Sequence, residues 1–128
     1  MLWSSYPAKI DEKFRLKIPA KFRREMAETE DGTYYVTSDD GLRAQIYPIP
    51  VWERMAQKFQ EAPRMDPAKL KLQKFTSYYG ILTQMDPQGR ILIPQALEAG
   101  LPREHLYVDP LVAALTCVAS FDVRSPIS

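Results

Sequence analysis

A fifteen-residue segment occurs twice in the chain, and this repeat constrains the fold more than any other feature. Residues 8–22 (AKIDEKFRLKIPAKF) align without gaps to residues 83–97 (TQMDPQGRILIPQAL), 75 residues further on. Apolar positions correspond between the copies, and four pairs are identical: Asp11/Asp86, Arg15/Arg90, Ile18/Ile93 and Pro19/Pro94. Self-similarity at a fixed spacing indicates a duplicated structural unit. Since each half of 128 residues is near the lower size limit for a core of its own, we expect two β-rich halves around one shared core.

Each copy of the repeat has the pattern of a strand, a tight turn, a second strand and the start of a helix. Alternating apolar residues flank a polar turn that begins with aspartate. Pro19 and Pro94 lack a backbone N–H, so each ends its strand and suits the first turn of a helix. The sequence therefore predicts short helices over 20–26 and 95–99, with Gly100 in the position that favours glycine after a helix.

The segment between the copies predicts a second hairpin and two helices. Residues 33–38 and 43–48 have strand composition and flank an acidic turn that contains Gly41. Residues 51–62 place Trp52, Met55, Ala56 and Phe59 at helical spacing on one apolar face. Asp66 followed by Pro67 is typical of an N-cap with proline at the first helical position, which opens a helix to about Tyr78.

These elements divide the chain into two halves. The first half, residues 1–64, ends with the helix over 51–62. The second half, residues 65–128, begins with the connecting helix and ends with a divergent segment, residues 110–128, which lacks the glycine and acidic turn of the first half. The alternation of this segment leaves two outcomes open: it completes the second half in altered form, or it is an incomplete end.

Charge is segregated along the chain although its sum is small. The formal net charge is +1, which is low for a monomer that coats nucleic acid through charge alone. Residues 9–24 hold seven basic and two acidic residues, whereas residues 25–40 hold six acidic residues and no basic one. Contact with a polyanion is therefore expected from the basic segment, where strand alternation places Lys13, Arg15 and Lys17 on one face without an acidic residue.

Each of these charged features has a second interpretation. A basic strand face also occurs as a solvated surface that deters edge-to-edge aggregation. Asp11 with Arg15, and Asp86 with Arg90, are spaced for an ion pair within the turn, which would hold the hairpin together instead of contacting phosphate.

Catalysis and metal binding are not indicated. His105 and Cys117 are the only histidine and cysteine, and the sequence has none of the nucleophile, metal or phosphate-loop motifs. We expect no catalytic residue, no metal ligand and no cofactor. A lone cysteine and an N-terminal segment without an apolar signal region favour the reducing cytoplasm. The most apolar stretch, residues 106–121, is interrupted by Asp109 and Pro110 and is too short to span a bilayer, so no membrane contact is expected.

Three segments together resemble the MraZ family of bacterial transcription regulators. They are IDEKFRLKIPAKF at 10–22, DGLRAQIYPIPVWERM at 40–55 and MDPQGRILIPQAL at 85–97, and the resemblance covers about residues 1–108. It implies an α+β, β-rich fold: a tandem AbrB-like swapped-hairpin barrel formed as an intrachain pseudo-dimer with short helices. It also implies sequence-specific binding to a promoter ahead of the cell-division and cell-wall gene cluster, in the cytoplasm at the nucleoid, by a ring-shaped homo-oligomer of about eight or more subunits.

The charge pattern and the resemblance together predict which residues contact DNA. The expected contacts are Lys13, Arg15, Lys17, Lys21, Arg23, Arg24 and Arg90, with Asp11, Asp86 and Gly89 forming the motif turns. Phe14 stands where the first copy should have glycine, which leaves two outcomes open: a positive φ there costs about 1 to 2 kcal/mol, or the turn adopts another type. An antitoxin-like or other protein-interaction module with weakened DNA binding is the alternative function.

Overall fold

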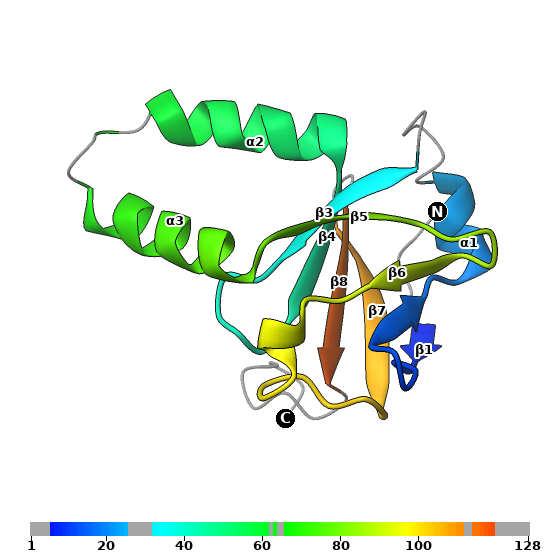
Figure 1. Ribbon diagram of the computed structural model, residues 1–128. Coiled ribbons are helices and arrows are strands. Elements are labelled where there is room, and N and C mark those ends of the chain that lie inside the picture. The colour runs from blue at the N-terminus through cyan, green and yellow to red at the C-terminus, as the bar shows by residue number, and fades with distance from the viewer. Residues whose placement is uncertain (1–5, 26–31, 62, 64–65, 112–113, 120–128) are drawn as a thin grey trace.

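The computed structural model describes residues 6–25, 32–61, 63, 66–111 and 114–119 (Figure 1). The fold is α+β, as expected. In chain order the elements are β1 (Tyr6–Ala8), β2 (Arg15–Lys17), α1 (Ala20–Glu25), β3 (Thr33–Thr37), β4 (Ala44–Pro48), α2 (Ile49–Glu61), α3 (Pro67–Tyr79), β5 (Ile81–Gln84), β6 (Arg90–Leu92), a 3-10 turn η1 (Gln95–Leu97), β7 (Leu106–Leu111) and β8 (Ala114–Ala119).

The order of the strands is symmetric under exchange of the two repeats. The larger sheet has the order β1-β7-β8-β4-β3-β5, and all of its pairs are antiparallel. Exchanging β1 with β5, β3 with β7 and β4 with β8 reverses this order and leaves it otherwise unchanged. The first strand of each half pairs with the hairpin of the other half, because β1 pairs with β7 and β5 pairs with β3. The strand pairs of the described residues do not form a closed barrel.

The remaining two strands, β2 and β6, pair with each other in a short ladder at the centre of this symmetry. Leu16 lies opposite Ile91, its repeat equivalent, while Lys17 lies opposite Arg90 and Arg15 lies opposite Leu92. Two further backbone bonds repeat this relation: Ile18 N–H donates to the Gly89 carbonyl at 2.9 Å, and Ile93 N–H donates to the Phe14 carbonyl at 3.0 Å. The pseudo-two-fold axis therefore passes through the Leu16–Ile91 pair.

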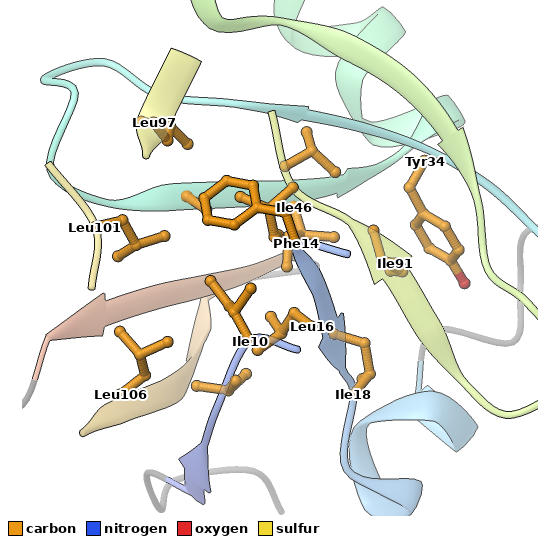
Figure 2. Close-up of a cluster of buried hydrophobic side chains, with 14 of the residues drawn as sticks. Ile10, Phe14, Leu16, Ile18, Tyr34, Ile46, Ile91, Leu97, Leu101 and Leu106 are labelled. Atoms are coloured by element: carbon orange, nitrogen blue, oxygen red, sulfur yellow. The ribbon is translucent and has the colours of Figure 1, made fainter. Parts of the chain in front are cut away.

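One hydrophobic core lies between the sheet and the ladder, and both halves build it. Figure 2 shows Ile10, Phe14 and Leu16 of the first half among Ile91, Leu97, Leu101 and Leu106 of the second. Leu16 and Ile91 are fully buried. Because alternate residues of a strand point to opposite faces, this places Arg15, Lys17, Arg90 and Leu92 on the outer face of the ladder.

Helices α2 and α3 follow the β3–β4 hairpin and lie together on one side of the strands (Figure 1). Trp52 attaches α2 to the sheet by stacking on Tyr35 at a ring distance of 4.3 Å. The Thr76 carbonyl attaches α3, because it accepts hydrogen bonds from the hydroxyls of Thr37 at 2.8 Å and Tyr35 at 3.1 Å. Neither helix buries a residue. On α3, the large side chains of Leu70 and Tyr78 are exposed. Leu82, on the following strand β5, is exposed as well.

The sequence predicts most of these elements within one or two residues. The hairpin β3–β4, helix α2 and helix α3 are confirmed, and the Asp66 carboxylate accepts from the Ala68 N–H at 2.9 Å with Pro67 at the helix start. The short helix predicted over 95–99 forms only over 95–97, as the single 3-10 turn η1. Gly100 does not adopt a positive φ, and it is required instead because a Cβ there would collide with the Gly41 carbonyl oxygen.

The divergent C-terminal segment takes part in the sheet. Residues 110–111 continue β7, and residues 114–119 form β8, which pairs with β4 of the first half. This much of the segment completes the hairpin that corresponds to β3–β4. Residues 120–128, together with Met26 and Ala62 of the expected helices, lie outside the described residues.

Leu16→Ala and Ile91→Ala are expected to destabilise the whole chain, because each deletes a fully buried side chain at the contact between the halves. Each change should lower the free energy of unfolding by about 2 to 5 kcal/mol, measured by urea denaturation. Leu92→Ala, next to Ile91 but 43% exposed, is the control and should change it by less than about 0.5 kcal/mol. Two separate unfolding transitions in either core variant would contradict a single shared core.

Candidate nucleic-acid interface

The two repeated turns, Asp11–Arg15 and Asp86–Arg90, have the same backbone structure; we refer to them as the motif turns. In the first, the Asp11 N–H donates to the Arg15 carbonyl at 2.9 Å. In the second, the Asp86 N–H donates to the Arg90 carbonyl, also at 2.9 Å. Each turn therefore ends at an arginine that is the first residue of the next ladder strand: Arg15 begins β2 and Arg90 begins β6.

The residue before each arginine has a positive φ in both turns. Phe14 has φ 60° and Gly89 has φ 82°, and each N–H donates to the carbonyl of its turn's aspartate at 2.9 Å. Of the two outcomes that Phe14 left open, the structure therefore shows the strained turn with a positive φ and no change of turn type. The fold keeps the turn because the Phe14 ring is a core side chain, 3% exposed, whose burial contributes more than the strain of about 1 to 2 kcal/mol costs.

Each turn aspartate binds its own turn through both carboxylate oxygens. Oδ1 of Asp11 accepts from the N–H groups of Lys13 at 3.0 Å and Arg15 at 2.9 Å. Oδ1 of Asp86 accepts from those of Gln88 and Arg90, both at 2.9 Å. Oδ2 accepts from the arginine Nε, at 3.0 Å in the first turn and 2.8 Å in the second. The intra-turn ion pair that the sequence left open is thus formed in both copies.

The two turns also contact each other across the pseudo-two-fold axis. Nη1 of Arg15 lies 3.8 Å from Oδ2 of Asp86, and Nη1 of Arg90 lies 3.8 Å from Oδ2 of Asp11. We refer to these four residues as the Asp–Arg quartet. Their side chains are between 25% and 31% exposed, so the quartet is half-buried but open to solvent. The expectation that the basic face carries no acidic group is therefore wrong, since two carboxylates lie within it.

The surroundings of the two carboxyls set their protonation. Burial raises the pKa of Asp11, but hydrogen bonds from Arg15 and Lys13 and the Arg15 charge outweigh it, and the pKa lies below its usual value. The backbone hydrogen bond from Arg90 is the main cause that lowers the pKa of Asp86, against a smaller effect of burial. Both carboxylates are therefore ionised at neutral pH, and the quartet has two positive and two negative groups.

Two further arginines lie against the motif turns. Arg23, from α1, occupies the space that a Cβ on Gly89 would need, and its Nε is buried without a hydrogen-bond partner among the described residues. Arg103 lies 5.8 Å from the centre of the Phe14 ring and forms an ion pair with Glu98 at 3.5 Å. One guanidinium thus contacts the positive-φ residue of each turn.

The other expected contact residues fall into two groups. Lys13, in the first turn, and Lys17, on β2, are exposed, and Lys17 lies directly opposite Arg90 in the ladder. The structure therefore gathers Lys17, Arg15 and Arg90 on one face. The side chains of Lys21 and Arg24 lie outside the described residues.

Sequence reasoning missed two residues: Leu92 on this face and Arg103 over the Phe14 ring. Leu92, 43% exposed, is the repeat equivalent of Lys17, so the alignment contained a signal for it. Arg103 has no such signal, because its position depends on how the loop after η1 folds back over Phe14. Among the described residues, no group of three or more histidine, cysteine, aspartate or glutamate side chains is placed to hold a metal ion. None of the described helices is long and apolar enough to cross a membrane.

Phe14→Gly tests whether core burial or backbone strain dominates in the first turn. Glycine removes the strain of about 1 to 2 kcal/mol but loses a buried phenylalanine, whose truncation costs about 3 to 5 kcal/mol. The variant should unfold at lower urea concentration, with a net loss of about 1 to 4 kcal/mol. Gly89→Ala, at the equivalent position, should also destabilise the chain, because it adds strain and displaces Arg23. A Phe14→Gly protein more stable than the parent would show that strain dominates.

Acidification is expected to weaken the quartet's contribution to stability. Because the pKa of Asp11 and of Asp86 is lower in the folded chain, their contribution is present above the unfolded value of about 3.9 and is lost as pH falls through the folded pKa. Urea denaturation from pH 7 to 2.5 should therefore show a difference between the parent and Asp11→Asn/Asp86→Asn that shrinks below pH of about 4. Glu53→Gln, an exposed change on α2, is the control. A difference that stays constant over this range would contradict the assignment.

Comparison with known proteins finds a matching family model and relatives that share its name. The family model described as "MraZ protein, putative antitoxin-like" matches residues 1–75. A relative named transcriptional regulator MraZ from Acidobacterium capsulatum is 44% identical over 97 residues, 76% of this chain and 66% of the relative. Relatives of the same name from Koribacter versatilis and Nitrosomonas europaea are each 38% identical, over 98% of this chain and 82% of the relative, and over 81% and 72%, respectively. The resemblance inferred from the motif turns is thus confirmed, and the chain belongs to the MraZ family.

Proposed function

We propose that this chain is a sequence-specific DNA-binding transcriptional regulator. The observation that carries the proposal is the pairing of β2 with β6, which brings Arg15, Lys17 and Arg90 onto one exposed face. A two-stranded ribbon is among the elements that the major groove of B-DNA admits. The relatives, which are named transcriptional regulators, support the same function.

The symmetry of the chain suits a double-stranded target. We propose that it consists of two AbrB-like halves, 1–64 and 65–128, arranged as an intrachain pseudo-dimer with exchanged hairpins. The strand order that reads the same from both ends supports this arrangement. Three of the proposed DNA contacts, Arg15, Lys17 and Arg90, lie on the ladder next to the pseudo-two-fold axis. The full proposed set is Lys13, Arg15, Lys17, Lys21, Arg23, Arg24 and Arg90, with the motif turns held by Asp11, Asp86 and Gly89.

The active form is proposed to be a ring-shaped homo-oligomer of about eight or more subunits that binds repeated promoter sites. A closed ring of head-to-tail contacts requires two different surfaces on each subunit. The α2–α3 pair supplies such a difference, because it lies on one side of the strands (Figure 1). The exposed side chains Leu70 and Tyr78 of α3, with Leu82 of β5, support burial against another molecule.

The remaining parts of the proposal follow from the family. The regulated promoter is proposed to precede the cell-division and cell-wall gene cluster, and the protein to reside in the cytoplasm at the nucleoid. It acts by binding, without catalysis or a cofactor.

Protein interaction is the second candidate function. The description of the family model as antitoxin-like favours it, and so does the absence of any buried residue in α2 and α3. A stoichiometric protein partner that co-purifies with the chain and is lost in Leu70→Ala/Tyr78→Ala would support this function. DNA binding retained by the same variant would separate it from the first.

Mobility-shift assays with DNA from upstream of the protein's own gene test the leading proposal. Arg15→Ala and Arg90→Ala should each weaken binding by about fivefold to 150-fold. Binding by the parent should also fall steeply as salt rises, because protein–phosphate contacts release counterions. Arg54→Ala removes the same charge from the exposed face of α2 and is the control; the oligomer size of all variants should match the parent. Binding that is insensitive to salt and to both arginine changes would overturn the proposal.

A further inference from the structure

We infer that Arg15 and Arg90 read base edges, principally guanine, whereas Lys13 and Lys17 contact phosphates, and that Asp11 and Asp86 position the two arginines. This division of labour rests on the proposed function. It assigns a chemical target to each group of the basic face, which would otherwise be one undivided cationic patch.

The charge balance of the quartet argues against phosphate as the target of the arginines. Each guanidinium is neutralised by its own carboxylate at 3.0 or 2.8 Å and has the carboxylate of the other turn at 3.8 Å. A phosphate beside Arg15 would approach Asp11 and Asp86 at similar distances, so carboxylate repulsion offsets guanidinium attraction. Phosphate affinity depends on uncompensated positive charge, and the quartet offers none.

The donors that remain on each arginine suit a neutral acceptor. Within the described residues, the side-chain hydrogen bonds of both guanidinium groups are made through Nε. The two terminal nitrogens form the planar fork that donates to O6 and N7 of guanine, the commonest specific contact in the major groove. Because O6 and N7 are uncharged acceptors, the neighbouring carboxylates do not exclude them as they exclude phosphate.

The quartet also fixes the direction of each fork. Both carboxylates are held by two backbone N–H groups of their own turn, at 2.9 to 3.0 Å, so the group that holds Nε is itself immobile. The contacts across the axis set one fork relative to the other. An arginine restrained before binding loses less side-chain entropy when it binds, and its geometry discriminates between bases more sharply.

The lysines have the opposite character. Lys13 and Lys17 are exposed, and no ion pair with either is found in the described part of the chain. Their ammonium groups are flexible, uncompensated point charges beside the quartet. These are the properties of residues that add to phosphate affinity without reading sequence.

Selection of binding sites from a random DNA duplex library tests the assignment directly. The parent protein should enrich a motif that contains guanine. Arg15→Lys and Arg90→Lys keep the charge but remove the fork, so each should weaken binding to the enriched motif by about fivefold to 150-fold relative to a scrambled duplex. The slope of log affinity against log salt should be unchanged. Asp11→Asn/Asp86→Asn should reduce the same preference while binding to the scrambled duplex becomes tighter.

Lys13→Gln/Lys17→Gln is the complementary variant, and fluorescence anisotropy over a salt series is its measurement. Affinity should fall equally for the enriched and scrambled duplexes, with the salt slope reduced by about 0.9 per lysine. Circular dichroism melts confirm that each variant is folded. A motif without guanine, or arginine-to-lysine variants that keep the preference and alter only the salt slope, would overturn the inference alone. A parent protein that enriches no motif would overturn the proposed function itself.

Discussion

Antiparallel pairing between segments 75 residues apart is the constraint on which the rest of this structure depends. Leu16 and Ile91 face each other at the centre of the β2–β6 ladder, and the neighbouring backbone bonds repeat on both sides of this pair. Because each half supplies an edge strand to the hairpin of the other, neither half completes its own sheet. A single core therefore forms only when both halves fold together, and that core fixes the ladder's outer face.

The same pairing turns two ordinary hairpin turns into one site. An exposed aspartate–arginine pair contributes little stability on its own. Here two such pairs meet across the axis, and every carboxylate oxygen has a partner. The result is a half-buried, electrically balanced group in which the orientation of each arginine depends on both turns. On this face, the uncompensated positive charge therefore belongs to the lysines, whereas the side chains of fixed orientation belong to the quartet.

The first turn shows how the core can override a local preference. A positive φ disfavours phenylalanine, and local rules leave another turn type open at Phe14. The turn nevertheless matches that of Gly89, because the ring fills the shared core and the Phe14 carbonyl accepts from the Ile93 N–H of the other half. The close approach of Gly100 to Gly41, beyond the short turn η1, is likewise a tertiary contact that no local propensity contains.

The sequence by itself contains the repeat. It also determined three local features: the turns that begin with aspartate, the alternation of Leu16 with its charged neighbours, and the cap at Asp66. These features follow from backbone geometry and side-chain spacing within a few residues, so the sequence predicts them. Only the tertiary structure decided that the two Asp–Arg pairs meet, that Arg23 covers Gly89, and that Arg103 lies over the Phe14 ring. The physical reason is that these distances are set by pairing between remote strands, which neither repeat encodes by itself.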